Sequence, residues 1–256
     1  MNSKRIFLIL TIVGALAFGV PGLNFYPQLS QGDHGRDLYA AQEVLRGKLP
    51  YKDFWWVYGP LMPYYYAFFY KIAGGHIGSF LLGKMLVKTA AAAFFYLAAA
   101  TAMAPSVAFL AAMWFVQSQQ EFFFTFNHIG GIAMEMMVIF LLFAYIQNQR
   151  PRALRLVVPA IFVYMLIKIN FGLTALAAAA LTVALADWVR KTPWTVDKKR
   201  FYLALAVLPL AAGFVYWLLV HNLPLYVIRQ CHPYFGDDQP HHFSPLVTIP
   251  YYFTQH

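Results

Sequence analysis

The sequence has few charged residues and almost no cysteine. Charged residues make up 11% of the 256 residues, whereas hydrophobic residues make up 61%. A soluble core cannot enclose so much apolar surface, so lipid must solvate much of the chain and a soluble globular fold is excluded. The single Cys231 excludes an intrachain disulfide. A glycine-rich phosphate-binding loop is also absent, which argues weakly against a nucleotide ligand.

Long apolar runs dominate what remains. A transmembrane helix needs about 20 mainly apolar residues, and seven runs predict an all-α polytopic membrane protein with about seven transmembrane helices. These runs cover residues 6–23, 78–103, 105–118, 129–147, 154–168, 171–188 and 201–220. The third and fifth runs are short, and residues 154–188 also fit one broken helical hairpin around the sequence KINFG.

Basic residues predict the orientation of these helices. They cluster before the first run, between the fourth and fifth, and between the sixth and seventh, so alternating crossings put all three clusters on one side. The positive-inside rule makes that side cytoplasmic. We therefore expect a multi-pass protein of the inner (plasma) membrane with a cytoplasmic amino terminus. The basic residues are Lys4, Arg5, Arg150, Arg152, Arg155, Arg190, Lys191, Lys198, Lys199 and Arg200.

Three further segments complete the predicted organisation. The amino terminus also resembles a secretory signal, but an uncleaved first helix keeps the charge pattern consistent. Residues 60–75 are apolar and aromatic but short, which predicts a helix lying at the membrane interface within an extracytoplasmic loop, 24–77. Residues 221–256 form an extracytoplasmic tail or begin a further helix. The chain is thus one transmembrane module, 1–256, and we expect it to be the amino-terminal part of a longer enzyme.

The loop 24–77 holds an unusual concentration of charge. Residues 33–46 have the spacing of an amphipathic helix, and Asp33 and Asp37 lie four residues apart on one face. Two carboxylates on one face repel each other unless a cation or solvent compensates them. Arg36, Lys48 and Lys52 are the nearby cations.

The same loop resembles the first extracytoplasmic loop of the C-type, polyprenyl-phosphate-dependent glycosyltransferases, which include protein O-mannosyltransferases and lipid A aminoarabinose transferases. The pattern covers about thirty residues and lies directly after the first transmembrane helix. It comprises Asp33, Gly35, Tyr39, Ala41, Leu45, Gly47, Pro50, Tyr51, Asp53, Phe54, Gly59, Pro60 and Leu61.

The resemblance implies an enzyme that transfers a sugar from a polyprenyl-phosphate donor to a lipid, glycan or protein acceptor outside the cytoplasm. It implies Asp33 as the catalytic base or the residue that organises it. Many relatives have Asp-Glu where this chain has Asp33-His34, which leaves open whether Asp37 supplies a second carboxylate. Cations would stabilise the departing phosphate while the base takes the acceptor's proton. The substrate-binding candidates are Arg36, Tyr39, Lys52, Lys84, Lys88 and Lys168.

Other features leave alternatives open. Glu135 lies inside an apolar run, and such a carboxylate is functional by default or pairs with a lysine. His128 is expected at the interface. A lipid-linked-sugar carrier without catalysis would also explain Glu135 and the lysines. The resemblance leaves a divalent cation undecided, and the tail has metal-ligating residue types without a standard zinc spacing, so no metal site is assigned. These tail residues are Cys231, His232, Asp237, Asp238, His241 and His242.

Overall fold

The computed structural model describes residues 3–20, 32–118, 126–149 and 151–223. Within these ranges the chain forms helices and no named strand. The helices are α1 (Ser3–Gly19), α2 (Gly32–Leu45), α3 (Leu61–Ala73), α4 (Ile77–Ala102), α5 (Pro105–Ser118), α6 (Phe126–Asn148), α7 (Pro151–Ile167), α8 (Ile169–Arg190) and α9 (Val196–Val220).

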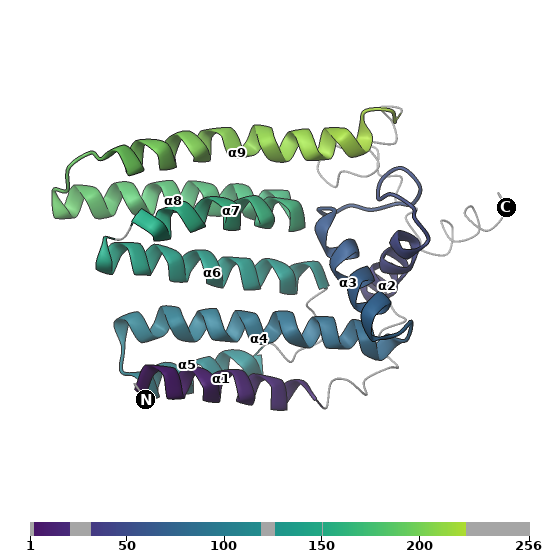
Figure 1. Ribbon diagram of the computed structural model, residues 1–256, viewed down its shortest axis with the longest axis horizontal. Coiled ribbons are helices and arrows are strands. Elements are labelled where there is room, and N and C mark those ends of the chain that lie inside the picture. The colour runs from purple at the N-terminus through teal and green to yellow at the C-terminus, as the bar shows by residue number, and fades with distance from the viewer. Residues whose placement is uncertain (1–2, 21–31, 119–125, 150, 224–256) are drawn as a thin grey trace.

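The long helices lie side by side in a bundle, and α2 and α3 lie across one end of it (Figure 1). α4 packs against α6 on one side and against α1 and α5 on the other, while α7 packs against α6, α8 and α9. The largest buried cluster lies among α6, α7, α8 and α9 and includes Leu154, Val157, Ile161 and Leu205. A second cluster, with Ala41, Tyr66, Phe80 and Ile167, joins α2 and α3 to α4 and α7.

The predicted fold class is confirmed in its general form, because the chain is a helical membrane protein. A helix forms in each of the seven predicted apolar runs. Four stretches of the described chain are long and apolar enough to cross a membrane, namely Ile77–Ala102, His128–Asn148, Ile169–Arg190 and Val196–Val220. The shorter α1, α5 and α7 have 17, 14 and 17 residues. The number of crossings therefore stays a prediction.

The break between α7 and α8 is a single residue, Lys168, with extended backbone angles of φ −156° and ψ 106°. The two helices pack on each other as a hairpin (Figure 1). Gly172 allows this close return, because a Cβ there would lie 2.6 Å from the Met165 backbone nitrogen. The break that the KINFG sequence indicated is therefore present, and the choice between two crossings and one broken hairpin stays open. The α3 helix also forms in the segment predicted to be interfacial, although its position relative to a membrane stays a prediction.

The basic helix ends meet at the end of the bundle opposite α2 and α3 (Figure 1). Lys4 Nζ, at the start of α1, donates to the Ala100 carbonyl near the end of α4 over 3.0 Å. Arg190, at the end of α8, donates to the Ile146 carbonyl near the end of α6. The shared location of the basic clusters agrees with the predicted alternation of helices.

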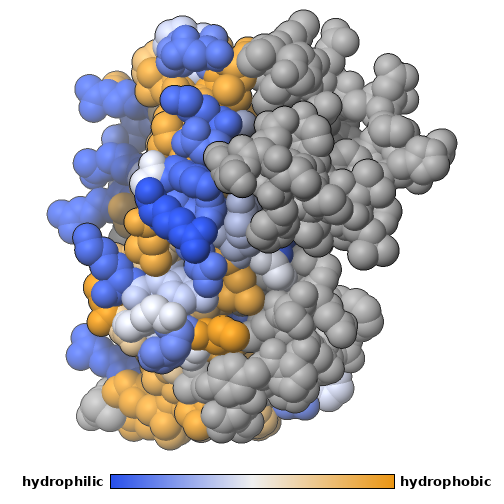
Figure 2. All heavy atoms as spheres, turned by 90° about the vertical axis from the view of Figure 1, so that its right-hand side faces the viewer, coloured by the Kyte–Doolittle hydropathy of each residue, from blue (hydrophilic) through white to orange (hydrophobic). Residues whose placement is uncertain are grey.

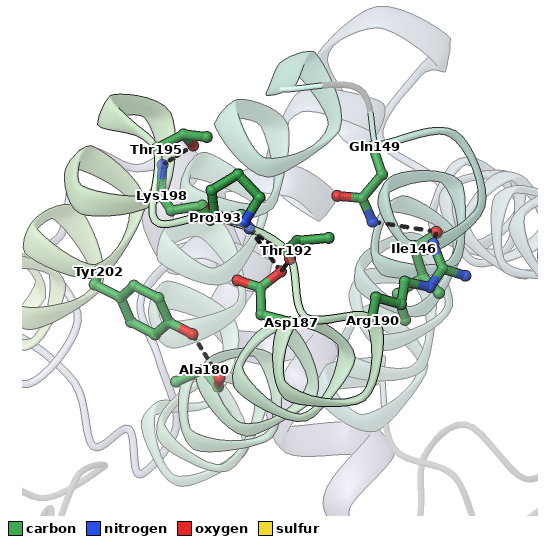
Figure 3. A network of polar contacts seen from close by, with 10 residues as sticks. All are labelled: Ile146, Gln149, Ala180, Asp187, Arg190, Thr192, Pro193, Thr195, Lys198 and Tyr202. Atoms are coloured by element: carbon green, nitrogen blue, oxygen red, sulfur yellow. Dashed lines mark hydrogen bonds and ion pairs between the residues drawn. The ribbon is translucent and has the colours of Figure 1, made fainter.

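A buried ion pair fixes the turn between α8 and α9 (Figure 3). Lys198 Nζ lies 2.8 Å from Asp187 Oδ1, and the two side chains are only 5% and 12% exposed. The same ammonium donates to Thr192 Oγ1 at 2.9 Å and to the Pro193 carbonyl at 3.0 Å. All three ammonium donors therefore have acceptors, which is the condition under which a buried lysine is tolerated.

Replacing Lys198 by Met should destabilise the fold strongly, because it leaves Asp187 buried without its cation. We expect a loss of about 3 kcal/mol, within the usual range for breaking a buried pair, and a fall in Tm of roughly 6–12 °C. Thermal unfolding of the purified protein in detergent measures this. Lys199→Met, at the exposed neighbouring position, is the control and should leave Tm nearly unchanged. Equal effects of the two substitutions would contradict the structural role of the pair.

Candidate functional site

The end of the bundle formed by α2 and α3 has a polar face. Figure 2 shows hydrophilic residues gathered on the described part of this end, beside apolar ones. Four parts of the chain come together here: α2, the segment 46–60, the first turns of α4, and the junction of α7 with α8. Each of these parts carries predicted site residues.

The segment 46–60 begins with a tight turn that explains several residues of the sequence pattern. Asp53 Oδ2 accepts a hydrogen bond from the Leu49 N–H at 2.8 Å, and the Asp53 N–H donates to the Leu49 carbonyl at 2.9 Å. Tyr51 and Phe54 are buried beside it. Asp53 therefore has a structural role. Lys52 is exposed on this turn and makes no hydrogen bond or ion pair with the described residues.

Tyr39 belongs to a different face of α2 from Asp37. It lies one turn before Glu43 and contacts the Phe54 ring edge-on at 6.2 Å. The Glu43 side chain is 1% exposed and is paired with Arg46 and Lys48, each at 2.5 Å. Burial, followed by the nearby Glu43 charge, raises the pKa of Tyr39. The structure thus groups Tyr39 with this ion cluster at the end of α2, and not with the cations around Asp37.

Arg36 and Asp37 form a second, buried pair on α2. Asp37 is only 2% exposed and accepts from Arg36 Nη2 at 3.2 Å. The Arg36 guanidinium also lies over the Tyr58 ring, 4.8 Å from its centroid, and near Trp56 and Trp55 at 5.6 and 5.9 Å. Aromatic faces attract cations, so the rings and Asp37 together fix the position of this guanidinium.

Lys168 reaches the same tyrosine from the break between α7 and α8. Its Nζ lies 5.3 Å from the centroid of Tyr58 and 4.0 Å from that of Phe171. The same atom is 2.9 Å from His128 Nε2, and the His128 ring lies edge-on to Tyr58 at 6.0 Å. Two predicted phosphate-binding cations, Arg36 and Lys168, therefore converge on one ring. We call this group the Tyr58 cluster: Arg36, Asp37, Tyr58, His128, Lys168 and Phe171.

The lysines of α4 extend the positive charge of this region. Lys84 is half-buried and lies close enough to Asp37 for their charges to interact, and Lys88, one turn further on, is within reach of the Lys84 charge. The backbone of α2 puts position 33 one turn before Asp37, as predicted. The Asp33 side chain, however, lies outside the described part of the structure.

Two other candidates lie away from the Tyr58 cluster or outside the description. Glu135 is exposed on α6 and interacts electrostatically with Tyr164 of α7. Within the described ranges, no group of three or more His, Cys, Asp or Glu residues could hold a metal ion. The metal-ligating residue types at 231–242 lie outside those ranges, so the structure does not test them.

Sequence reasoning missed the importance of Tyr58 and His128. Tyr58 lay in an aromatic stretch in which no ring stood out, and His128 was expected only to be interfacial. A signal for His128 was present in the two glycines that follow it. A Cβ at Gly130 would lie 2.6 Å from Met62 Sδ, and one at Gly131 would lie 3.3 Å from Tyr164. These glycines let the first turns of α6 approach α3 and α7 closely.

An apolar pocket lies beside the Tyr58 cluster, between α3, α7 and α9. Its volume is about 280 Å³, and its lining includes Pro60, Leu61, Tyr64, Leu166 and Leu219. Pro60 follows Gly59, and Leu166 precedes Lys168 by two residues. The apolar pocket and the Tyr58 cluster therefore share two segments of chain, the one around residue 59 and the end of α7.

The described geometry favours the binding of an anion next to a hydrocarbon chain. Guanidinium and ammonium groups are the usual protein ligands of phosphate, and the aromatic rings hold both cations in place. Comparisons of the chain with protein-family models, with curated protein sequences and with solved structures found no match. The class is therefore that of a helical membrane protein, and its function is inferred from the sequence pattern and this geometry.

Substituting Gly59 tests how the segment 46–60 is joined to α7. Its N–H donates to the Ile167 carbonyl at 2.9 Å, and its carbonyl accepts from Trp56 Nε1 at 2.9 Å. A Cβ at this position would lie 2.0 Å from the Leu166 carbonyl oxygen. Backbone cannot move aside as a side chain can, so Gly59→Ala should cost about 3 kcal/mol and lower Tm by roughly 6–12 °C.

The control for Gly59→Ala is Gly213→Ala in α9, where a Cβ would meet no atom within 4 Å. Alanine also favours a helix over glycine, so this second variant should keep or slightly raise its Tm. Thermal unfolding in detergent compares the two variants. A Tm of Gly59→Ala equal to that of the wild type would contradict the close contact with α7.

Glu43 should make stability depend on pH. Burial alone would raise the pKa of its carboxyl, but hydrogen bonds from Lys48 and Arg46 outweigh burial and hold the pKa below its usual value. The charged carboxylate is therefore favoured in the folded protein. Its contribution to the stability of the fold is fully present above the unfolded pKa of about 4.3. This contribution is lost as the pH falls through the lower folded pKa. The Tm difference between wild type and Glu43→Gln should be largest near neutral pH and shrink below about pH 4; a constant difference would refute this.

Proposed function

We propose that the protein is a membrane glycosyltransferase of the C-type, which transfers a sugar from a polyprenyl-phosphate donor to an acceptor. The observation that carries this proposal is the Tyr58 cluster. In this cluster a cation of the loop that resembles the superfamily, Arg36, and a cation from a distant helix junction, Lys168, lie near the same ring. Their distances to the centroid of the Tyr58 ring are 4.8 and 5.3 Å. The neighbouring apolar pocket fits the hydrocarbon of a lipid-linked donor.

The chemistry divides among these residues. Arg36 and Lys168, with Lys84 and Lys88 behind them, bind the donor phosphate and stabilise its charge as it leaves. Asp33 is the base that takes the proton of the acceptor hydroxyl. Asp37 is the second carboxylate on α2 and the partner of the base. Its 3.2 Å contact with Arg36 makes it a positioning residue for the guanidinium. A divalent cation is not assigned a role.

The proposed location follows from the distribution of charge. The chain crosses the plasma (inner) membrane seven times, with its amino terminus in the cytoplasm, and α3 lies in the interface. Under the positive-inside rule the basic end of the bundle faces the cytoplasm. The Tyr58 cluster lies at the other end, beside α2 and α3, and therefore faces the extracytoplasmic side, where lipid-linked sugars are used.

Sugar transfer by purified protein in liposomes tests the proposal. A panel of polyprenyl-phosphate sugars is offered with candidate acceptors, and release of polyprenyl phosphate is measured. Asp33→Asn should lower the rate by at least about 100-fold, the usual contribution of a general base. Asp53→Asn is the matched control, since an amide oxygen can still accept from the Leu49 N–H, and it should retain most of the activity.

Three outcomes separate the alternatives. Turnover by wild type and its loss in Asp33→Asn support the enzyme and its base. Full activity of Asp33→Asn refutes this base. Donor binding and movement across the bilayer without any release of polyprenyl phosphate would instead identify a lipid-linked-sugar carrier.

A further inference from the structure

The short contact between Lys168 and His128 limits the total positive charge that the two side chains can carry. Their nitrogen atoms, Nζ and Nε2, are 2.9 Å apart. When Lys168 is an ammonium it can only donate, so Nε2 of the imidazole accepts and the imidazole is neutral, with its proton on Nδ1. If both groups were protonated, two like charges and two donors would face each other. The pair in this geometry therefore carries one positive charge.

The surroundings of the pair make a second proton costly unless an anion is present. Tyr58 and Phe171 cover two sides of the ammonium, and the His128 ring also lies edge-on to Phe171 at 6.0 Å. Both His128 and Lys168 are half-buried. Rings stabilise one cation, but the lower effective dielectric strengthens repulsion between two.

Among the described residues, the charged and titratable neighbours of the pair are three cations, two carboxylates and two tyrosines. On the segment 46–60 the neighbour is Tyr58, with Arg36 of α2 on the same ring. From α7, Tyr164 contacts Phe171. The remaining charged groups are Glu135 further along α6, Lys84 and Lys88 on α4, which packs along α6, and Asp37, which is paired with Arg36.

We propose that Lys168 and His128 form one phosphate-binding site that takes up a proton when the phosphate binds. This inference rests on the proposed function and extends it by assigning His128 to the site. A phosphate oxygen beside both nitrogen atoms accepts from each, so the bound state favours an imidazolium next to the ammonium. By linkage, phosphate binds more tightly as the pH falls.

Proton uptake at this site matches the charge change of the transfer reaction. The acceptor oxygen loses its proton and bonds to the anomeric carbon. The bond from that carbon to the phosphate oxygen breaks, and its electron pair stays on the phosphate. The phosphate thereby changes from a diester with one negative charge to a monoester with two. The acceptor's proton leaves through the base to water, and the proton that His128 took up when the donor phosphate bound offsets the added charge.

Calorimetric titration of the full chain in detergent tests the proposal with farnesyl methyl phosphate as the probe. This diester has no second ionisable proton, so any proton taken up belongs to the protein. Titrations at neutral pH in two buffers of different ionisation enthalpy give the number of protons. We expect an uptake of about half to one proton per phosphate in the wild type, and a Kd that falls by up to about tenfold per pH unit between pH 8 and pH 6. Titration into empty micelles provides the blank.

Two variants give the proposal its controls. His128→Gln keeps a neutral acceptor for Lys168 but cannot be protonated, so it should bind the probe without proton uptake and with a flat pH profile. Lys168→Met should weaken binding by more than tenfold. Uptake that persists in His128→Gln overturns the proposal. If that variant does not fold, a pH-independent Kd in the wild type overturns it equally well.

The outcomes also separate this inference from the proposed function. Proton-linked binding of the diester without sugar transfer from any donor would support the site and refute the enzyme. Sugar transfer with probe binding but no proton uptake would support the enzyme and refute the role of His128. Absence of probe binding in the wild type would overturn the inference.

Discussion

The hydrogen bond from the Gly59 N–H to the Ile167 carbonyl joins the two halves of the candidate site. It attaches the polar segment 46–60 to the end of α7, one residue before Lys168. Without a side chain at position 59, the two backbones come so close that Tyr58 projects beside Lys168. Tyr51 contributes to the same connection through its hydroxyl, which donates to the Tyr58 carbonyl. The position of Tyr58 thus depends on backbone contacts, and both cations lie against its ring.

The positions of the helices could be predicted from the sequence, because each apolar run is long enough to carry its own signal. The break at Lys168 could be predicted as well, since a lysine followed closely by Asn170 and Gly172 interrupts an apolar run. The number of membrane crossings could not, because α1, α5 and α7 are shorter than a full span. Length alone does not distinguish a short span from a helix buried among longer ones.

Sequence patterns name candidate residues for the site, but they could not show which of these residues lie together in the fold. Helical spacing put Asp33 and Asp37 on one face, yet it could not show that Asp37 would be buried against Arg36. Tyr39 and Lys52 share a stretch of 17 residues with Arg36, but α2 turns Tyr39 toward Glu43 and the Asp53 turn exposes Lys52. His128 and Lys168 are forty residues apart, and only tertiary packing brings their nitrogen atoms within 2.9 Å. Contacts of this kind leave no periodic signal in a sequence.

The burial of Asp37 bears on how two carboxylates of α2 divide their tasks. A base must reach the acceptor and exchange its proton with water, whereas Asp37 is 2% exposed and engaged by Arg36. An ionised carboxylate in such a position is tolerated because a cation compensates it, and in return it fixes that cation. Asp37 is therefore suited to hold Arg36 against Tyr58 and not to take a proton from an acceptor. Asp37 is thus suited to positioning, and the proposal assigns proton transfer to Asp33, one turn earlier on α2.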